Sequence, residues 1–189
     1  MTSSADKGRL LTTLARGAIA QAFGQSVQRP ALPEWLFQSG ATFVTLTQDG
    51  QLRGCIGTLE AHRPLAEDLE HNARAAAFED PRFPPLGEKE LEHTRVEVSI
   101  LSRPEPMRFR DEADALAQLR PGVDGVILES GWHRSTFLPQ VWEQLPDPGE
   151  FMAHLKRKAG LAPDYWSDDV RLSRYTVEKY KEEIQEHPS

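Results

Sequence analysis

The pattern of apolar and polar positions predicts four helices along the chain. In residues 5–23, apolar residues recur at helical spacing, and Gly24 follows as a C-terminal stop. Residues 65–78, 111–119 and 150–159 have the same kind of periodicity, and Gly160 caps the last of these segments. The helices are separated by shorter segments with a different repeat.

Those shorter segments predict β-hairpins. Residues 41–47 and 51–59 flank Asp49-Gly50, a dipeptide typical of a tight turn because both turn positions need a positive φ. Residues 94–101 alternate strictly between apolar and polar side chains, and a second hairpin is expected around Ser130-Gly131. Strands that form hairpins and are interrupted by helices indicate an α+β antiparallel fold.

A hairpin followed by a helix occurs twice, at residues 41–79 and 123–159. The two passages share negligible sequence identity, so an internal duplication is only a weak inference. Residues 29–35 contain two prolines and are expected to form a loop. The polar C-terminal segment, residues 176–187, has no pattern that assigns its structure.

Composition narrows the class of protein. With 189 residues, 39% of them hydrophobic and 27% charged, the chain is expected to form one globular domain, in two lobes if it carries an insertion. The net charge of −7 disfavours nucleic acid as a partner. No stretch suits a membrane span or a signal peptide, and a single cysteine fits the reducing cytoplasm, where we expect the protein.

The single cysteine, Cys55, lies in the second strand of the first hairpin. Alternation places one set of side chains on each face of that strand: Leu52, Gly54 and Ile56 on one, Arg53, Cys55 and Gly57 on the other. A cation beside a thiol favours the thiolate, and two glycines leave room for a ligand or for a bulge that offers N–H groups to an anion. The alternative is that Cys55 fills the core and the glycines mark a bulge or a close backbone approach.

Four more residues are candidates for the same site. Asp80 and Arg82 could place an acid and a base beside the thiol, although a loop held by an Asp–Arg bond is the favoured interpretation. Glu97 and Ser99 lie on the non-apolar face of their strand, where Glu97 could pair with Arg53. The histidines lack metal-ligand spacing and nucleotide-binding loops are absent, so we expect neither a metal nor a cofactor.

Several blocks in order along the chain resemble the AMMECR family. They are GATFVTL, LRGCIGTLE, AAAFEDPRFPPL, VEVSILSRPEP, PGVDGVIL, STFLPQVWEQ and FMAHLKRKAGL. Prokaryotic members are called AmmeMemoRadiSam system protein A. The resemblance implies an α+β domain over residues 1–189, in which two β-and-α repeats share a mainly antiparallel, barrel-like sheet with flanking helices. N- and C-terminal parts are expected to pack together.

The resemblance also marks RGCIG, residues 53–57, as the family hallmark, and implies Memo-like and radical-SAM proteins as partners. Two hypotheses follow. The first is a binding or adaptor module that uses an RGCIG cleft, with Arg53, Gly54 and Gly57 among its ligand-binding residues. The second is a small enzyme in which Cys55 acts as nucleophile or acid on an anionic small molecule. The first is favoured, because the sequence places no catalytic base beside Cys55.

Overall fold

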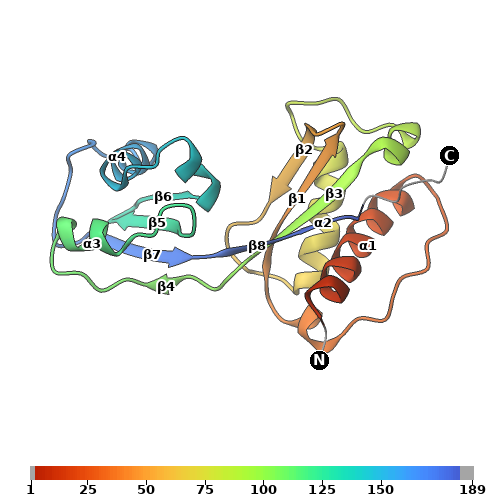
Figure 1. The fold of residues 1–189 in the computed structure, drawn as a ribbon, viewed down its shortest axis with the longest axis horizontal. Coiled ribbons are helices and arrows are strands. Elements are labelled where there is room, and N and C mark those ends of the chain that lie inside the picture. The colour runs from red at the N-terminus through yellow and green to blue at the C-terminus, as the bar shows by residue number, and fades with distance from the viewer. Residues whose placement is uncertain (1–2, 184–189) are drawn as a thin grey trace. The chain divides into compact units, whose positions relative to one another are not determined.

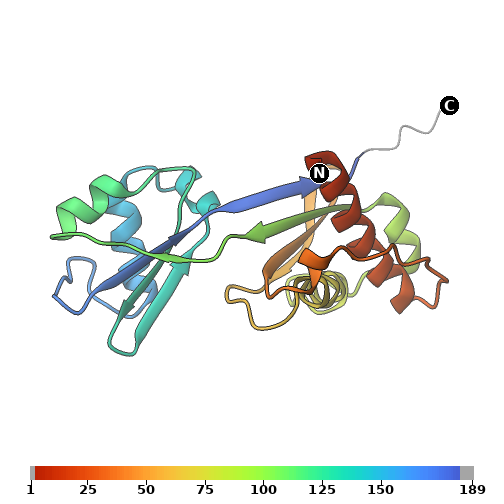
Figure 2. The ribbon, with the colours of Figure 1, turned by 90° about the horizontal axis from the view of Figure 1, so that it is seen from below.

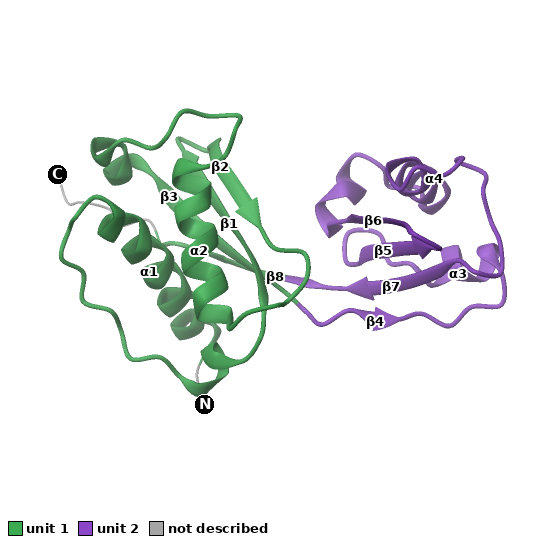
Figure 3. Cartoon of the chain, turned by 180° about the vertical axis from the view of Figure 1, so that it is seen from behind, with its two compact units in different colours: residues 1–101, 178–189 green, residues 102–177 purple. Residues whose placement is uncertain are grey.

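Two antiparallel sheets, one in each of two units, organise the chain (Figure 3). The computed structural model describes residues 3–183. The first unit comprises residues 1–101 and 178–189, and the second comprises residues 102–177. The chain therefore leaves the first unit, forms the second, and returns.

The first unit contains a four-stranded sheet of order β2-β1-β3-β8 (Figure 1). Its elements are α1 (Ser4–Ala22), η1 (Glu34–Phe37), β1 (Ala41–Gln48), β2 (Gln51–Gly57), α2 (Leu65–Phe78), η2 (Glu88–His93), β3 (Arg95–Leu101) and β8 (Val177–Lys181). Residues 176–187, whose structure the sequence pattern did not assign, thus contribute an edge strand that ends at Lys181. Residues 184–187 lie outside the described residues.

Both α-helices of the first unit lie on one face of this sheet (Figures 1 and 2). Val44 and Leu46 of β1 and Val96 and Val98 of β3 are fully buried beneath them. Because side chains alternate along a strand, the residues between these valines and leucines point to the opposite face. That face, which carries no α-helix of this unit in the described part of the chain, is the helix-free face below.

The first hairpin confirms the turn prediction and corrects the predicted alternation. Asp49 and Gly50 have φ values of 51° and 77°. A β-bulge follows, because Leu46 pairs with Gly54 while Thr47 pairs with Leu52. The residue between these two partners, at position 53, is extra in the register. The alternation beyond the bulge is as predicted, but Leu52 lies on the same side as Cys55 and not opposite to it.

The second unit contains a sheet of order β4-β7-β5-β6. Its elements are β4 (Glu105–Pro106), α3 (Glu112–Gln118), β5 (Gly125–Ser130), β6 (His133–Phe137), η3 (Pro139–Glu143), α4 (Pro148–Lys158) and β7 (Arg171–Tyr175). Phe151 of α4 stacks on Trp142 with ring centroids 3.8 Å apart, and both are buried in the core. The second predicted hairpin is confirmed, with Gly131 at φ 61° in its turn.

The α+β class and the antiparallel pairing are confirmed. The strands of residues 3–183 form two four-stranded sheets, and closure into a barrel is not shown. Among the described helices, none has the length and apolar character that crossing a bilayer requires.

Candidate functional site

Three side chains form a row across β2, β1 and β3 on the helix-free face. Cys55 pairs with Thr45, and Thr45 pairs with Glu97 on its other side. The Thr45 hydroxyl lies 3.3 Å from the Cys55 sulfur, and Cys55 is partly exposed as a residue. Two strand spacings separate Cys55 from Glu97, about 10 Å between backbones, so a ligand could bridge them although they do not touch.

A second row runs parallel to the first. Gly57 pairs with Phe43, and Phe43 pairs with Ser99. Four predicted site residues, Cys55, Gly57, Glu97 and Ser99, therefore share one face of the sheet. Ser99 is buried, whereas Glu97 is partly exposed.

Arg53, the bulge residue, is directed to a different element. Its Nε and Nη2 atoms donate to the Glu90 carboxylate of η2 at 3.2 and 3.1 Å. The hydrogen bond from Arg53 is the main cause that lowers the pKa of Glu90, and the Gly87 N–H adds to it. The considered pairing of Arg53 with Glu97 is therefore not formed. The Arg53 side chain is only 10% exposed, which leaves little of it for an anionic ligand.

Neither glycine leaves open space at the position where its own side chain would lie. A Cβ at Gly54 would lie 2.1 Å from the Ala76 carbonyl oxygen of α2, and a Cβ at Gly57 would lie 2.2 Å from the Phe43 ring. Both positions thus need glycine for close packing. The expectation that these glycines open the main chain around Cys55 to a ligand is wrong, because a helix backbone and an aromatic ring fill the space.

Asp80 and Arg82 cover the outer edge of β2 at Cys55. The Cys55 N–H donates to Asp80 Oδ2 at 3.0 Å, and Arg82 Nη2 lies 3.5 Å from the Cys55 carbonyl oxygen. Arg82 Nη2 also donates to Asp80 Oδ2 at 2.8 Å, so the two side chains form the local Asp–Arg bond that the sequence favoured. They occupy the backbone groups that a neighbouring strand would use, and the Cys55 N–H is not available to an anion.

Charge and an aromatic ring stabilise this loop. The Arg82 hydrogen bond is the main cause that holds the pKa of Asp80 well below its usual range, and Asp80 in turn raises the pKa of Arg82. The Phe83 ring centroid lies 5.5 Å from the Arg82 guanidinium carbon and 5.9 Å from that of Arg53. Arg82 is 55% exposed, so it is the more accessible of the two guanidinium groups.

Sequence reasoning missed a buried polar network at the start of α2. Asp68 is fully buried and accepts hydrogen bonds from the Thr42 N–H and hydroxyl, the Thr58 hydroxyl, Arg63 Nε and Asn72 Nδ2. These donors come from β1, from the segment after β2 and from α2 itself. Because the β1 donor is 26 residues from Asp68 and the segment after β2 has no regular pattern, only the polar residues on the apolar face of α2 could have indicated the network.

The comparisons with known proteins identify the family. The AMMECR1 family profile matches residues 12–180. The chain belongs to the AMMECR1 family. A family relative in Methanothermobacter thermautotrophicus is 40% identical over 185 residues, which cover 95% of this chain and 96% of that protein. A relative in Thermotoga maritima is 46% identical over 154 residues, covering 80% and 83% of the two chains.

A solved structure supports the family fold. The crystal structure of an uncharacterized protein from Pyrococcus horikoshii matches with a TM-score of 0.80 at 34% identity, covering 100% of this chain and 97% of that one. The names of these relatives state no activity. Family membership and fold are therefore shown, and function has to be argued from the site. Among residues 3–183, no three His, Cys, Asp or Glu side chains are grouped as metal ligands would be.

Proposed function

We propose that this AMMECR1-family protein is a binding or adaptor module whose contact surface is the helix-free face around Cys55. The observation that carries the proposal is the row of Cys55, Thr45 and Glu97, which presents a thiol, a hydroxyl and a carboxylate across three strands. The partners we propose, following the family resemblance, are a Memo-like protein and a radical-SAM protein. The proposed setting is the cytoplasm, whose reducing conditions keep a single thiol free.

The surroundings of the thiol favour binding over catalysis. The side-chain partner of Cys55 is the Thr45 hydroxyl, which is not a general base. Arg53 is paired with Glu90, and Asp80 is bound to Arg82 and to the Cys55 N–H. The groups that would activate a nucleophile are thus engaged in holding the strand and its edge. The RGCIG motif is compatible with the enzyme hypothesis, but this geometry supports that hypothesis less than it supports a binding module.

The test is a titration of the purified protein with a Memo-like protein and, separately, with a radical-SAM protein from the same organism, followed by calorimetry. Glu97→Lys reverses a charge on the helix-free face and should weaken binding at least tenfold. The matched control is Glu67→Lys, which makes the same charge reversal at an exposed position of α2 and should change the affinity less than twofold.

Cys55→Ser separates the two hypotheses. An adaptor keeps its affinity within about threefold when sulfur is replaced by oxygen, because shape and hydrogen bonding are nearly retained. If wild-type protein binds neither partner, or if both charge reversals weaken binding equally, the proposed surface is wrong. Thermal melts of each variant distinguish lost contacts from lost folding.

A further inference from the structure

A groove in the first unit lies away from the row around Cys55. It has a volume of about 1070 Å³ and follows one side of α1 from Ser4 to Ala20, between that helix, the end of η2 and β8. The sixteen helical rises between these two residues correspond to roughly 24 Å, which is the length of an extended segment and not of a small anion. Neither Cys55 nor its row lines the groove.

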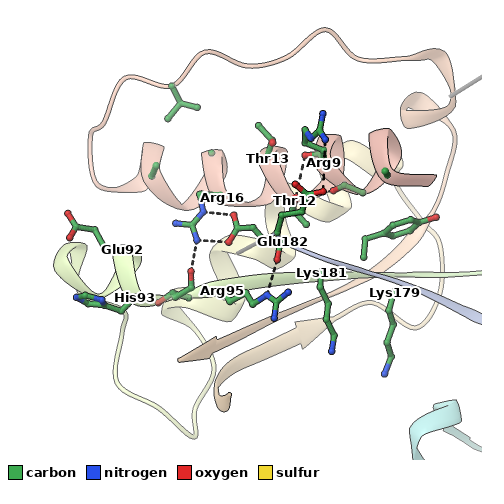
Figure 4. A pocket seen from close by; sticks show the side chains of 18 of the residues that line it. Arg9, Thr12, Thr13, Arg16, Glu92, His93, Arg95, Lys179, Lys181 and Glu182 are labelled. Carbon is green, nitrogen blue, oxygen red and sulfur yellow. Dashed lines mark hydrogen bonds and ion pairs between the residues drawn. The ribbon is translucent and has the colours of Figure 1, made fainter. Parts of the chain in front are cut away.

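One ion pair closes the inner wall of the groove. Arg16 Nε and Nη2 donate to the Glu182 carboxylate at 2.6 and 2.7 Å (Figure 4), and Arg16 Nη1 donates to the Leu91 carbonyl at 3.0 Å. Glu182 Oε1 also accepts the Val96 N–H at 3.2 Å. The end of β8 is thereby fixed to α1 and β3, so the outer side of β8 is presented on a rigid support.

The outer edge of β8 has backbone groups directed away from the sheet. β8 is the last strand in the order of its sheet. The Glu182 N–H donates to the Val96 carbonyl of β3 at 2.9 Å, so it points inward. Because N–H directions alternate along a strand, the N–H groups of Lys179 and Lys181 point to the outer edge, where no strand of residues 3–183 pairs with β8; this is the free edge below.

The side chains of β8 alternate between the two faces of the sheet. Tyr180 packs on Gly8 of α1, while Lys179 and Lys181 point away from that helix (Figure 4). Both lysines are exposed, and neither has a hydrogen bond or ion pair with residues 3–183. Five Lys or Arg and three Glu side chains line the groove, although the whole chain has a net charge of −7. An acidic strand is therefore complementary to this edge.

We propose that the free edge of β8 binds an extended acidic segment of a partner protein, which adds to the sheet as a further strand. Main-chain hydrogen bonds to the Lys179 and Lys181 positions supply affinity. Alternate side chains then fall on two faces, small or apolar ones in the groove along α1 and acidic ones beside the two lysines. The two lysines point to the helix-free face, as Glu97 of the neighbouring strand does, so this edge adjoins the surface proposed at Cys55; strand addition itself does not depend on that proposal.

The probe is a fluorescein-labelled peptide of five Glu-Val repeats, and binding to the full-length protein is followed by fluorescence anisotropy. We expect it to bind at least tenfold more tightly than a Glu-Pro repeat, which has the same charge but lacks alternate N–H donors. A Lys-Val repeat tests the sign of charge and should not bind. Equal binding of the Glu-Val and Glu-Pro peptides would overturn strand addition in favour of simple attraction between charges.

Variants locate the site. The double variant Lys179→Glu, Lys181→Glu should weaken binding of the Glu-Val peptide at least tenfold. The control Arg74→Glu, Lys89→Glu makes the same change of charge at exposed positions outside the groove, and should stay within threefold of wild type. Cys55→Ser should also leave peptide binding unchanged, and the peptide assay contains no Memo-like or radical-SAM protein, so failure of either proposal is seen separately.

Two results would overturn the proposal in other ways. If no peptide binds at 50 mM salt, the two lysines serve only to prevent edge-to-edge pairing, which is a common role of lysine on edge strands. If light scattering instead detects a dimer that the double lysine variant abolishes, the occupant of the edge is a second copy of this chain.

Discussion

Replacing Gly54 by alanine tests how closely β2 approaches α2. The added Cβ would lie 2.1 Å from the Ala76 carbonyl oxygen, whereas ordinary contacts begin at 3.4 Å. The strand or the helix must therefore move by roughly 1 Å, because a backbone carbonyl cannot rotate away as a side chain can. Overpacking of this kind costs about 1–3 kcal/mol, and the lower entropy of the unfolded alanine chain returns at most about 1 kcal/mol.

Urea unfolding followed by circular dichroism measures this cost. With an m-value of about 2 kcal/mol per M, a net loss of about 1–2 kcal/mol lowers the midpoint by about 0.5–1 M. The control is Gly87→Ala, where φ is −86° and the nearest atom to the new Cβ is a Glu90 oxygen at 3.5 Å. That variant should match wild type or gain slightly. If Gly54→Ala unfolds at the same urea concentration as Gly87→Ala, the close approach is not what requires glycine.

Three further predictions concern charged groups. Asp80→Asn should destabilise the protein by about 1–3 kcal/mol at pH 7. Because the folded pKa of Asp80 is lowered, wild type keeps this advantage above the usual aspartate range and loses it as the pH falls toward the folded pKa. Asp68→Ala should cost about 3–5 kcal/mol, since it leaves buried donors unpaired. Glu112→Ala should cost more than Lys156→Met, because Lys156 is buried and Glu112 is partly exposed.

Urea unfolding measured from pH 7 down to pH 3 checks the first of these, and the same assay at pH 7 checks the others. A stability difference between wild type and Asp80→Asn that stays constant down to pH 3 would contradict the assigned pKa direction. An Asp68→Ala variant as stable as wild type would mean that water replaces the carboxylate. Equal losses for Glu112→Ala and Lys156→Met would show that the lysine reaches solvent.

Local patterns predicted most elements of the fold. The Asp49-Gly50 turn and the helix near residues 5–23, observed at Ser4–Ala22, follow from short-range signals that act within a few residues. The strand at Val177–Lys181 could not be assigned, because its pairing partner β3 is about eighty residues away in sequence. A polar edge strand has little pattern of its own and is determined by the neighbour that it pairs with.

The site was predicted in part, for a similar reason. Cys55, Glu97 and Ser99 follow strand alternation, and the structure places them on one face. Arg53 does not follow it, because a bulge before Gly54 interrupts the alternation and an ion pair with a distant helical turn fixes the side chain. Sequence periodicity carries no signal for either event.

The five residues of RGCIG therefore fall into two groups: four that pack or pair within the first unit, and Cys55. Gly54 allows the backbone of α2 to approach closely, Ile56 packs against the core, and Gly57 lies against the Phe43 ring. Arg53 joins the bulge to η2. Each of these four has a packing or pairing reason that would hold in a protein with no ligand. Cys55 is the exception, since it lies on the helix-free face, is partly exposed, and has the Thr45 hydroxyl as its side-chain hydrogen-bonding partner among residues 3–183. Four residues thus build the strand and its packing, and the fifth is the one on which the proposed contact surface depends.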